Sequence, residues 1–437
     1  MYSKQILSLL KKKGIAIGDE VRLESSKGSF TGLLMPRPEG AENTFVIKLP
    51  NGYNVGIDSA GAELELVKKA APKPARAQEP EGRGEIAILG CGGTISSKVE
   101  YKTGAVFPAI SPQELKNAFP DLGKIAKVHA RQLFSLFSED MNSHHWQEVA
   151  REVEKEIKAG AKGVVLMHGT DTMSYTSAAI SFMLRGLQAP VVFVGAQRSS
   201  DRPSSDNEAN LLNAVYAARQ DMAEVGVCMH AGPSDDCCHL HRGTRVRKLH
   251  TSARDAFKSV NCAPMAKVDY RRGMFEALSG YRARGKGEPV TDTRMSQNVA
   301  LIYVHPNIQP KFISSLGKYD GVVLMGTGLG HVATNPFGDK SVLSVLPAVR
   351  ELTESGVAVA MAAQPIYGRV NMNVYTSGRL LMEAGVMGDG LDMTPETAFV
   401  KLSWILGHEK KIGRIREEYH TNLAGEFGQR SFLGETA

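Results

Sequence analysis

The sequence has little cysteine and no long apolar run, and each shortage excludes a class of protein. Its 437 residues include five cysteines, and this odd number without regular spacing does not suggest a disulfide framework. No uninterrupted apolar segment is long enough to span a membrane. The first residues also lack the apolar core of a signal peptide. We therefore expect a cytoplasmic protein with no membrane contact.

Two common phosphate-binding motifs are missing or incomplete. The chain has no G-x-x-x-x-G-K-[ST] loop. The run from Gly90 begins like a G-x-G-x-x-G dinucleotide fingerprint, but Ile95 stands where the third glycine belongs. The adjacent Cys237 and Cys238 do not match the usual spacing of zinc ligands. We therefore interpret these two cysteines as residues at a strand end near a site rather than as metal ligands. We expect no metal and no cofactor in this chain.

The balance of charge is moderately basic. The formal net charge is +6 and the pI is about 8.9. This balance suits an anionic partner such as RNA. Because many basic proteins bind no nucleic acid, the charge alone does not establish such a partner.

The length predicts two or three domains, and the first is small and β-rich. Polar and apolar residues alternate at 19–24 and, more loosely, at 44–49, with turn signals at 26–28, 37–40 and 50–52. Residues 1–70 therefore predict an SH3-like or Sm-like β-barrel, which could contact RNA, a peptide or a neighbouring domain, or serve only for docking. A Pro- and Ala-rich linker follows at 71–83.

Residues 84–285 predict an α/β domain. Apolar runs at 86–89, 164–167, 191–194 and 225–228 alternate with helical patterns, which indicates a mainly parallel sheet covered on both faces. The predicted helices open at Ser111, run from Asn142 or Ser143 to near Gly160, and span 177–187 and 210–223.

A second linker at 286–297 precedes a smaller α/β domain at 298–437. Strands are expected at 299–304, within 321–328, where an apolar run ends in glycine, and at 357–362, and helices at 341–355 and 395–406. The tail after Gly425 is expected to be poorly ordered unless a partner organises it.

Three apolar strands of the larger domain end in glycine and polar residues. The clearest ends in His168, Gly169, Thr170, Asp171 and Thr172. The other two end at Gly90–Thr94 and at Gly195–Arg198. Because the carboxyl ends of parallel strands meet at one edge, these residues predict a catalytic crevice.

The chemistry of this crevice is suggested by a hydroxyl and an amine. Thr94 follows glycines whose backbone amides could stabilise an oxyanion, and it could act as a nucleophile once a base takes its proton. Lys248 could be that base if burial keeps its amine neutral. Taken singly, Thr94 is more often structural, Lys248 a solvated surface residue and Asp171 a helix cap.

The combination of motifs is more specific than any member. Residues 91–95, 168–172 and 248–252 appear in the order of the three active-site motifs of the L-asparaginase/glutaminase family, and residues 138–142 resemble its substrate-binding segment. The resemblance covers residues 85–406. Cys91 stands where the family usually has threonine, which should alter the packing beneath the loop.

This resemblance implies an asparaginase-like two-domain core and a set of roles. Thr94 would be the nucleophile, Thr170, Asp171 and Lys248 a second triad, and Tyr101 a tyrosine of the mobile lid. The residues implied in substrate binding are Gly93, Ser138, Glu139 and Gly169. Ser138 and Glu139 would hold the substrate's α-carboxylate and α-amino groups, and Asp171 would pair with the amine.

The N-terminal module and linker narrow the resemblance to the D subunits of archaeal-type glutamyl-tRNA(Gln) amidotransferases. Residues 51–57 and 198–206 add to it. It implies glutamine hydrolysis, with asparagine as the other possible amide donor, and transfer of ammonia to a partner E subunit that amidates Glu-tRNA(Gln). ATP and Mg would bind that partner, and a homodimer of this chain would form the core of a heterotetramer. The alternatives are a stand-alone L-asparaginase with an accessory domain and a non-catalytic amino-acid sensor.

Overall fold

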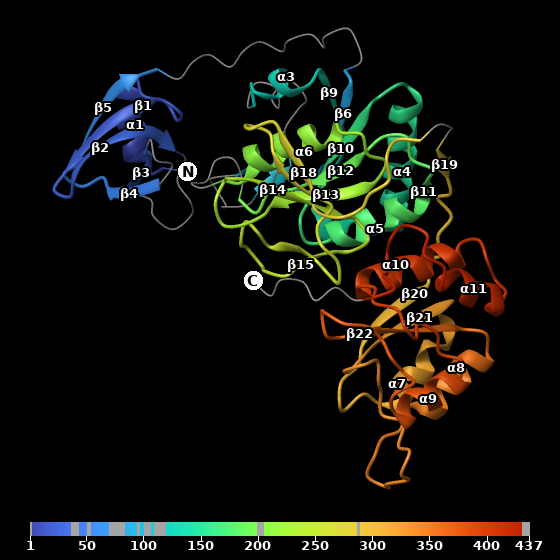
Figure 1. Ribbon diagram of the computed structural model, residues 1–437. Coiled ribbons are helices and arrows are strands. Elements are labelled where there is room, and N and C mark those ends of the chain that lie inside the picture. Colours follow the sequence, from blue (N-terminus) through green and yellow to red (C-terminus); the bar gives the residue numbers. More distant parts are fainter. Residues whose placement is uncertain are drawn as a thin grey trace.

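The computed structural model contains a small β-rich unit followed by two α/β domains (Figure 1). None of the helices in the part of the chain that it describes is long and apolar enough to cross a membrane. The described residues are 2–35, 43–49, 54–69, 84–93, 97–99, 106–108, 119–198, 205–285 and 289–430.

The N-terminal unit is a five-stranded antiparallel sheet with one helix. The elements are α1 (Lys4–Lys12), β1 (Glu20–Ser25), β2 (Gly28–Met35), β3 (Thr44–Lys48), β4 (Asn54–Asp58) and β5 (Glu63–Lys68), with strand order β4-β3-β2-β1-β5. The alternation predicted at 19–24 is confirmed, since Val21 and Leu23 are buried between exposed or half-buried polar residues. Ile6 and Leu10 of α1 pack on the same core.

The turn predicted at 26–28 connects β1 to β2, whereas those predicted at 37–40 and 50–52 lie outside the described residues. No pairing between β4 and β5 is present among the described residues, so closure into a barrel stays a prediction.

The larger domain is built on an eight-stranded sheet of order β18-β17-β14-β13-β12-β10-β6-β9. The strands are β6 (Ile86–Gly92), β9 (Val128–Leu136), β10 (Gly163–Met167), β12 (Val191–Val194), β13 (Val225–His230), β14 (Cys238–Arg242), β17 (Ala266–Asp269) and β18 (Met274–Ala277). Five neighbouring strands, β9, β6, β10, β12 and β13, run parallel to one another. The other three, β14, β17 and β18, pair antiparallel. Every residue of β10 is buried, as its continuous apolar run predicts for a central strand.

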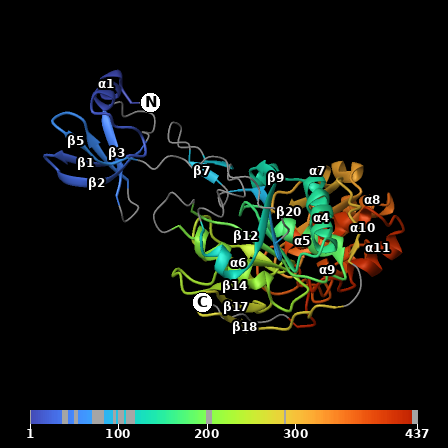
Figure 2. The same ribbon diagram turned by 90° about the horizontal axis from the view of Figure 1, so that it is seen from above.

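Helices cover both faces of this sheet, as predicted. On one face α4 (Ser143–Lys158) and α5 (Met173–Met183) share a core with Leu89, Leu166 and Phe193. On the other, α3 (Leu122–Ile125) and α6 (Asn207–Ala218) pack on the alternate residues. Figure 2 shows α6 and α4 on opposite sides of the sheet.

The predicted helix bounds in this domain are right in one case and shifted in two. Asn142 caps α4, and its side chain accepts a hydrogen bond from the His144 amide, as expected. The helix predicted at 177–187 instead starts at Met173 and ends at Met183, because Leu184 and Arg185 form β11 (Leu184–Arg185) against β19 (Val290–Thr291). The helix predicted at 210–223 starts and ends earlier, as α6. The helix predicted to open at Ser111 lies outside the described residues.

The smaller domain has a three-stranded parallel sheet of order β20-β21-β22. Its elements are β20 (Val299–Tyr303), α7 (Pro310–Ser314), η3 (Ser315–Lys318), β21 (Gly321–Gly326), α8 (Leu346–Glu354), β22 (Ala358–Ala363), α9 (Thr376–Glu383), α10 (Pro395–Leu406) and α11 (Ile412–Tyr419). The bounds of α10 match the prediction. The helix predicted at 341–355 begins only at Leu346, where Pro347 occupies its first turn.

The two α/β domains share one hydrophobic core through α10, which lies between α5 and the smaller sheet (Figure 1). The rings of Phe182 and Trp404 stack with centroids 6.0 Å apart. The indole N–H of Trp404 donates to the carbonyl of Asp292, in the segment that joins the domains. The larger domain is therefore in direct contact with α10 of the smaller one.

The prediction that the tail is poorly ordered after Gly425 is wrong up to residue 430. Glu426 is fully buried and forms an ion pair with Lys401 of α10 at 2.5 Å. A buried ammonium requires such a counter-charge, and this requirement fixes the tail to the helix.

Candidate active site

The carboxyl ends of β6, β10 and β12 meet at one edge of the large sheet, as their sequences predict. The parallel register aligns Met167 of β10 with Gly90 of β6 and with Val194 of β12. The residues that follow each strand therefore lie side by side.

Three of the predicted substrate-binding residues are in close contact at this edge. Gly93 has a φ of +84°, and a Cβ there would lie 2.4 Å from Cα of Gly169. A Cβ on Gly169 would in turn lie 2.7 Å from Cβ of Ser138. Glycine is therefore required at both positions, because no side chain fits between the strand ends.

The side chains of Thr170, Asp171 and Lys248 come together although Lys248 is distant in sequence. Nζ of Lys248 lies 2.9 Å from Oγ1 of Thr170 and 2.8 Å from Oδ1 of Asp171. Thr170 is buried, whereas the Asp171 side chain is 66% exposed and that of Lys248 is 13% exposed. The cluster thus combines a nearly buried amine with a carboxylate that a solvent-borne substrate can reach.

Lys248 is delivered by a short hairpin. It ends β15 (Val246–Lys248), which pairs antiparallel with β16 (Phe257–Ser259) and sets Lys248 opposite Phe257. Side chains alternate along a strand, so Val246 and Lys248 share one face. Val246 is buried in the core with α5, which directs Lys248 toward the residues that precede that helix.

Ser138 and Glu139 lie in the short 3-10 helix η2 (Ser138–Asp140). Ser138 is buried, and its carbonyl accepts a 2.6 Å hydrogen bond from Oγ1 of Thr172. Glu139 is exposed. This bond ties the predicted substrate-binding segment to the turn that carries Thr170 and Asp171.

Two predicted catalytic residues, Thr94 and Tyr101, lie outside the described residues, so their roles stay predictions. The nearby strands β7 (Ser97–Val99) and β8 (Val106–Pro108) pair antiparallel. Gly93 is the last described residue before Thr94, which places the chain beside Gly169 immediately before Thr94.

His168 is hydrogen-bonded to the turn that carries Gly169 and Thr170. It is fully buried, and its Nδ1 lies 2.6 Å from the carbonyl oxygen of Gly169. Burial lowers the pKa of His168 to about 4, so the ring is neutral near pH 7 and its Nδ1–H donates to that carbonyl. Apart from its place in the motif, no feature of the sequence singles out this histidine.

The cysteine at position 91, where the resemblance expects threonine, packs in the core. The residue is buried in the apolar core that lies under α4 and α5. Burial raises the pKa of the Cys91 thiol to about 12, so it stays protonated and packs as a small apolar group.

Sequence reasoning missed a buried polar network behind the site. Asp206 accepts hydrogen bonds from the backbone N–H groups of Gln197 and Arg198, after β12, and from Nδ2 of Asn210. Oδ1 of Asn210 in turn lies 2.5 Å from Nδ1 of His230. Arg198 and Asp206 belong to the segment 198–206 already singled out, but nothing in the sequence indicates that Asp206 binds the backbone after β12 or that Asn210 contacts His230, 20 residues further on.

The cysteine and histidine residues at 237–241 lie on or next to β14. Cys238 contacts Nδ2 of Asn213 at 3.4 Å, and His241 bonds Oγ of Ser259. Among the described residues, no three His, Cys, Asp or Glu side chains are grouped as metal ligands.

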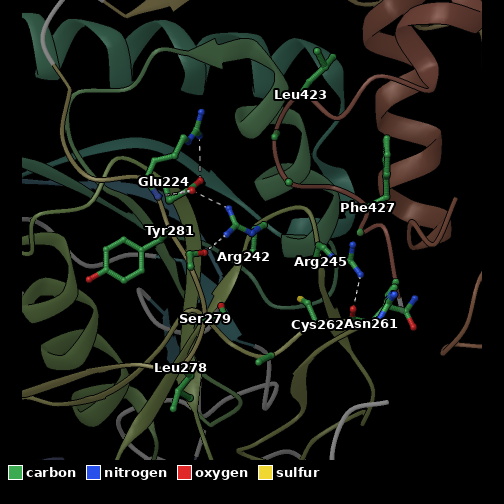
Figure 3. Close-up of a pocket in the computed structure, with 17 residues that line it drawn as sticks. Glu224, Arg242, Arg245, Asn261, Cys262, Leu278, Ser279, Tyr281, Leu423 and Phe427 are labelled. Carbon is green, nitrogen blue, oxygen red and sulfur yellow. Dashed lines mark hydrogen bonds and ion pairs between the residues drawn. The ribbon is translucent and has the colours of Figure 1, made fainter. Parts of the chain in front are cut away.

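A cavity of about 730 Å³ lies apart from these residues, between the larger domain and the C-terminal tail (Figure 3). Glu224 pairs there with both Arg242 and Arg282, and these arginines hold the pKa of its carboxyl below the usual value despite its burial. Leu423, Phe427 and Arg430 of the tail form the facing wall. None of the predicted site residues lines it.

Comparison with known proteins identifies the class of the core. The family model described as "Asparaginase, N-terminal" matches residues 85–277, and "Glutaminase/Asparaginase C-terminal domain" matches 298–418. The thermostable L-asparaginase from Thermococcus kodakarensis is 32% identical in sequence with a TM-score of 0.69, covering 78% of this chain and 99% of that one. L-asparaginase I from Vibrio cholerae is 28% identical with a TM-score of 0.68, covering 79% and 100%. The fold is an asparaginase-type two-domain core preceded by a further domain.

The N-terminal domain and the full-length relatives define the family more closely. The family model "GatD N-terminal domain" matches residues 15–67. The D subunit of glutamyl-tRNA(Gln) amidotransferase from Pyrococcus furiosus is 47% identical over 97% of both chains. The D subunit from Methanothermobacter thermautotrophicus is 43% identical over 99% of this chain and 98% of that one. The chain belongs to the family of glutamyl-tRNA(Gln) amidotransferase D subunits, which confirms the resemblance drawn from its motifs.

Proposed function

We propose that this protein is the glutamine-hydrolysing subunit of a tRNA-dependent amidotransferase. It releases ammonia from the side-chain amide of glutamine and supplies it to a partner E subunit, which converts Glu-tRNA(Gln) to Gln-tRNA(Gln). The observation that carries the proposal is the convergence of Lys248, Thr170 and Asp171 beside Gly93 in a chain that also has the N-terminal domain of this family.

In the proposed reaction Thr94 is the nucleophile. Its hydroxyl loses a proton and attacks the amide carbon, and the backbone amides near Gly93 and Thr94 or Thr170 hold the oxyanion. The C–N bond then breaks, and the nitrogen takes up a proton and leaves as ammonia. Water hydrolyses the resulting acyl-enzyme to glutamate and regenerates the Thr94 hydroxyl.

The described cluster supplies proton transfer and substrate recognition. Lys248 either takes the proton from the nucleophile itself or relays that proton as part of the base, since its amine lies against the Thr170 hydroxyl. Asp171 has an exposed carboxylate suited to the substrate's α-ammonium group. Ser138 and Glu139 hold the remaining polar groups of the amino acid, and Tyr101 acts from the lid.

The remaining parts of the proposal rest on the family resemblance. ATP and Mg bind the partner subunit, and two copies of this chain form the core of a cytoplasmic heterotetramer. The N-terminal domain serves assembly rather than amide hydrolysis.

Ammonia release by the purified chain tests the proposal. Glutamine and asparagine are supplied separately, with and without the partner subunit and glutamylated tRNA. We expect slow glutamine turnover by the chain alone and a sharp rise when partner and charged tRNA are added. A Thr94→Ala variant should release no ammonia under either condition.

The second candidate is a stand-alone L-asparaginase, since one of known structure is 32% identical, although the 47% identity to a D subunit over nearly the whole chain does not favour it. It predicts rapid asparagine turnover without the partner, and that result would exclude the proposed function. Amino-acid binding without ammonia release would instead indicate a sensor.

A further inference from the structure

The strand that carries Lys248, β15, forms an ion pair with the smaller α/β domain. Nε of Arg247, the residue next to Lys248, lies 3.0 Å from Oε1 of Glu396 in the first turn of α10. Because side chains alternate along β15, Arg247 projects away from the face that Val246 and Lys248 share. The strand is therefore held on both faces, by the core on one and by Glu396 on the other.

The residues immediately before β15 are tied to the same domain. Oγ1 of Thr397 donates to the carbonyl of Thr244 at 2.8 Å, and Oγ1 of Thr244 donates to the carbonyl of Ala424 at 3.1 Å. The Arg245 guanidinium donates to both carboxylate oxygens of Asp392 at 3.1 and 3.0 Å, with both side chains almost fully buried. Residues 244, 245 and 247 thus each bond to residues of the C-terminal region.

The same helix also packs on the element that follows Thr170 and Asp171. The rings of Tyr175 in α5 and Phe399 in α10 meet edge to face, with centroids 6.2 Å apart. Burial, together with the negative charge of Glu396, raises the pKa of Tyr175 to about 12, so its hydroxyl stays neutral between the two helices. Helix α10 consequently contacts both the strand that carries Lys248 and the helix that follows Thr170 and Asp171.

We infer that Arg247 and Glu396 are positioning residues, which hold Lys248 Nζ at hydrogen-bond distance from Thr170 across the domain boundary. The inference rests on the proposed function for the role of Lys248. Oε2 of Glu396 is buried and makes no hydrogen bond to the described residues, so loss of Arg247 leaves that carboxylate without the cation it faces. A shift of Lys248 by about 1 Å is enough to lower turnover about 100-fold.

The test compares two arginine variants at the same domain boundary, each in the complete complex. Arg247→Met removes the contact with Glu396. Arg185→Met is the matched control, because the Arg185 guanidinium lies over the Trp404 ring of α10 at 5.6 Å and its strand, β11, pairs with β19 rather than with β15. We expect Arg247→Met to lower kcat for glutamine about 100-fold with little change in KM, and Arg185→Met to leave both constants near wild type. Arg247→Lys, which keeps the charge, should recover part of the lost kcat.

A double-variant cycle separates positioning from general destabilisation. If Arg247 acts through Lys248, then Arg247→Met lowers turnover no further once Lys248→Met is present. Full additivity of the two changes, or an Arg247→Met kcat equal to that of Arg185→Met, would overturn the inference. Should Arg247→Met not fold, Glu396→Gln is the variant to use, because glutamine is nearly isosteric with glutamate. An unchanged kcat in Glu396→Gln would overturn the inference equally.

Failure of the proposed function is recognised separately. If the wild-type complex releases no ammonia, the function is wrong, and the rate of reductive methylation of Lys248, followed by mass spectrometry, tests the positioning alone. Arg247→Met should raise that rate several-fold over both wild type and Arg185→Met. Equal rates would contradict the positioning role.

Discussion

Nζ of Lys248 donates a 2.9 Å hydrogen bond to Oγ1 of Thr170 across 78 residues of sequence. The two groups come from different parts of the larger domain, one from a hairpin and the other from the end of a central strand. Their contact places the Lys248 amine within proton-transfer distance of a buried hydroxyl, which is the arrangement that the proposed reaction needs.

Replacement of Lys248 should abolish amide hydrolysis without unfolding the protein. We expect Lys248→Met to lower kcat by a factor of about 100 to 10,000, the usual contribution of proton transfer by a positioned side chain. Lys267→Met, in β17 and away from the predicted site residues, is the matched control and should retain activity. The measurement is ammonia release by the complex, with circular dichroism as the check on folding. Near-normal turnover in Lys248→Met would remove Lys248 from the mechanism.

An added methyl group at Gly169 should disrupt the site. In Gly169→Ala the new Cβ would lie 2.7 Å from Cβ of Ser138, so the predicted substrate-binding segment must move. We expect a loss of stability of about 1–3 kcal/mol in urea unfolding, together with a raised KM for glutamine. Gly413→Ala is the control, because Gly413 lies in α11 where an added Cβ would meet open space, and it should stabilise the protein by about 0.5–1 kcal/mol. A Gly169→Ala protein with wild-type stability and KM would contradict this packing.

The stability of the protein should fall between about pH 6.5 and pH 4 because of His168. Its pKa is about 4 in the folded protein, against an ordinary value of 6.5, so in this range the unfolded chain binds a proton that the folded chain does not. The unfolded state is thereby favoured as the pH falls, by about 3 kcal/mol in total.

His168→Asn isolates this contribution. Asparagine can keep a donor to the Gly169 carbonyl but does not titrate. Urea unfolding at pH 7.5, 6, 5 and 4 should therefore show a shallower loss of stability in the variant. Parallel pH profiles for the two proteins would show that His168 is not the group responsible.

The tail should be anchored by the buried pair of Lys401 and Glu426. Burial lowers the pKa of Lys401, and the attraction of Glu426 opposes that effect. Glu426→Gln leaves the ammonium without its counter-charge and should cost about 3–5 kcal/mol in urea unfolding. Lys401→Met combined with Glu426→Gln should recover most of this loss, since neither charge is then buried. A single variant as stable as wild type would exclude the anchoring role.

Much of the fold could be predicted because burial leaves a clear pattern in the sequence. The apolar runs at 164–167 and 191–194 are central strands, and the Pro395 start of α10 follows a good capping residue, Thr394. The helix ends of α5 and α6 were misplaced because both helices are buried on nearly every side and mix apolar with small polar residues, so periodicity marks no boundary. The order of the tail depends on one long-range ion pair, which no local pattern contains.

The candidate site could be predicted only in part. The strand-end residues Gly93, Gly169 and Thr170 follow from the parallel sheet, and Lys248 was found through its motif. The support of the site could not be predicted, since the contacts of Arg247 with Glu396 and of Arg245 with Asp392 join residues about 150 positions apart. Nothing in the composition or spacing of either segment indicates its partner.

An isotope label on the amide nitrogen follows the proposed ammonia transfer from glutamine to tRNA-bound product. The complex of this chain with its partner subunit is given ATP, Mg, Glu-tRNA(Gln) and glutamine labelled with ¹⁵N in the side-chain amide, and the glutamine esterified to tRNA is analysed by mass spectrometry. We expect ¹⁵N in that product for the wild type, and for the Thr94→Ala complex a product formed from added ammonium but not from glutamine. Labelled product formed equally well by the Thr94→Ala complex would contradict the proposed function of Thr94 and of the chain.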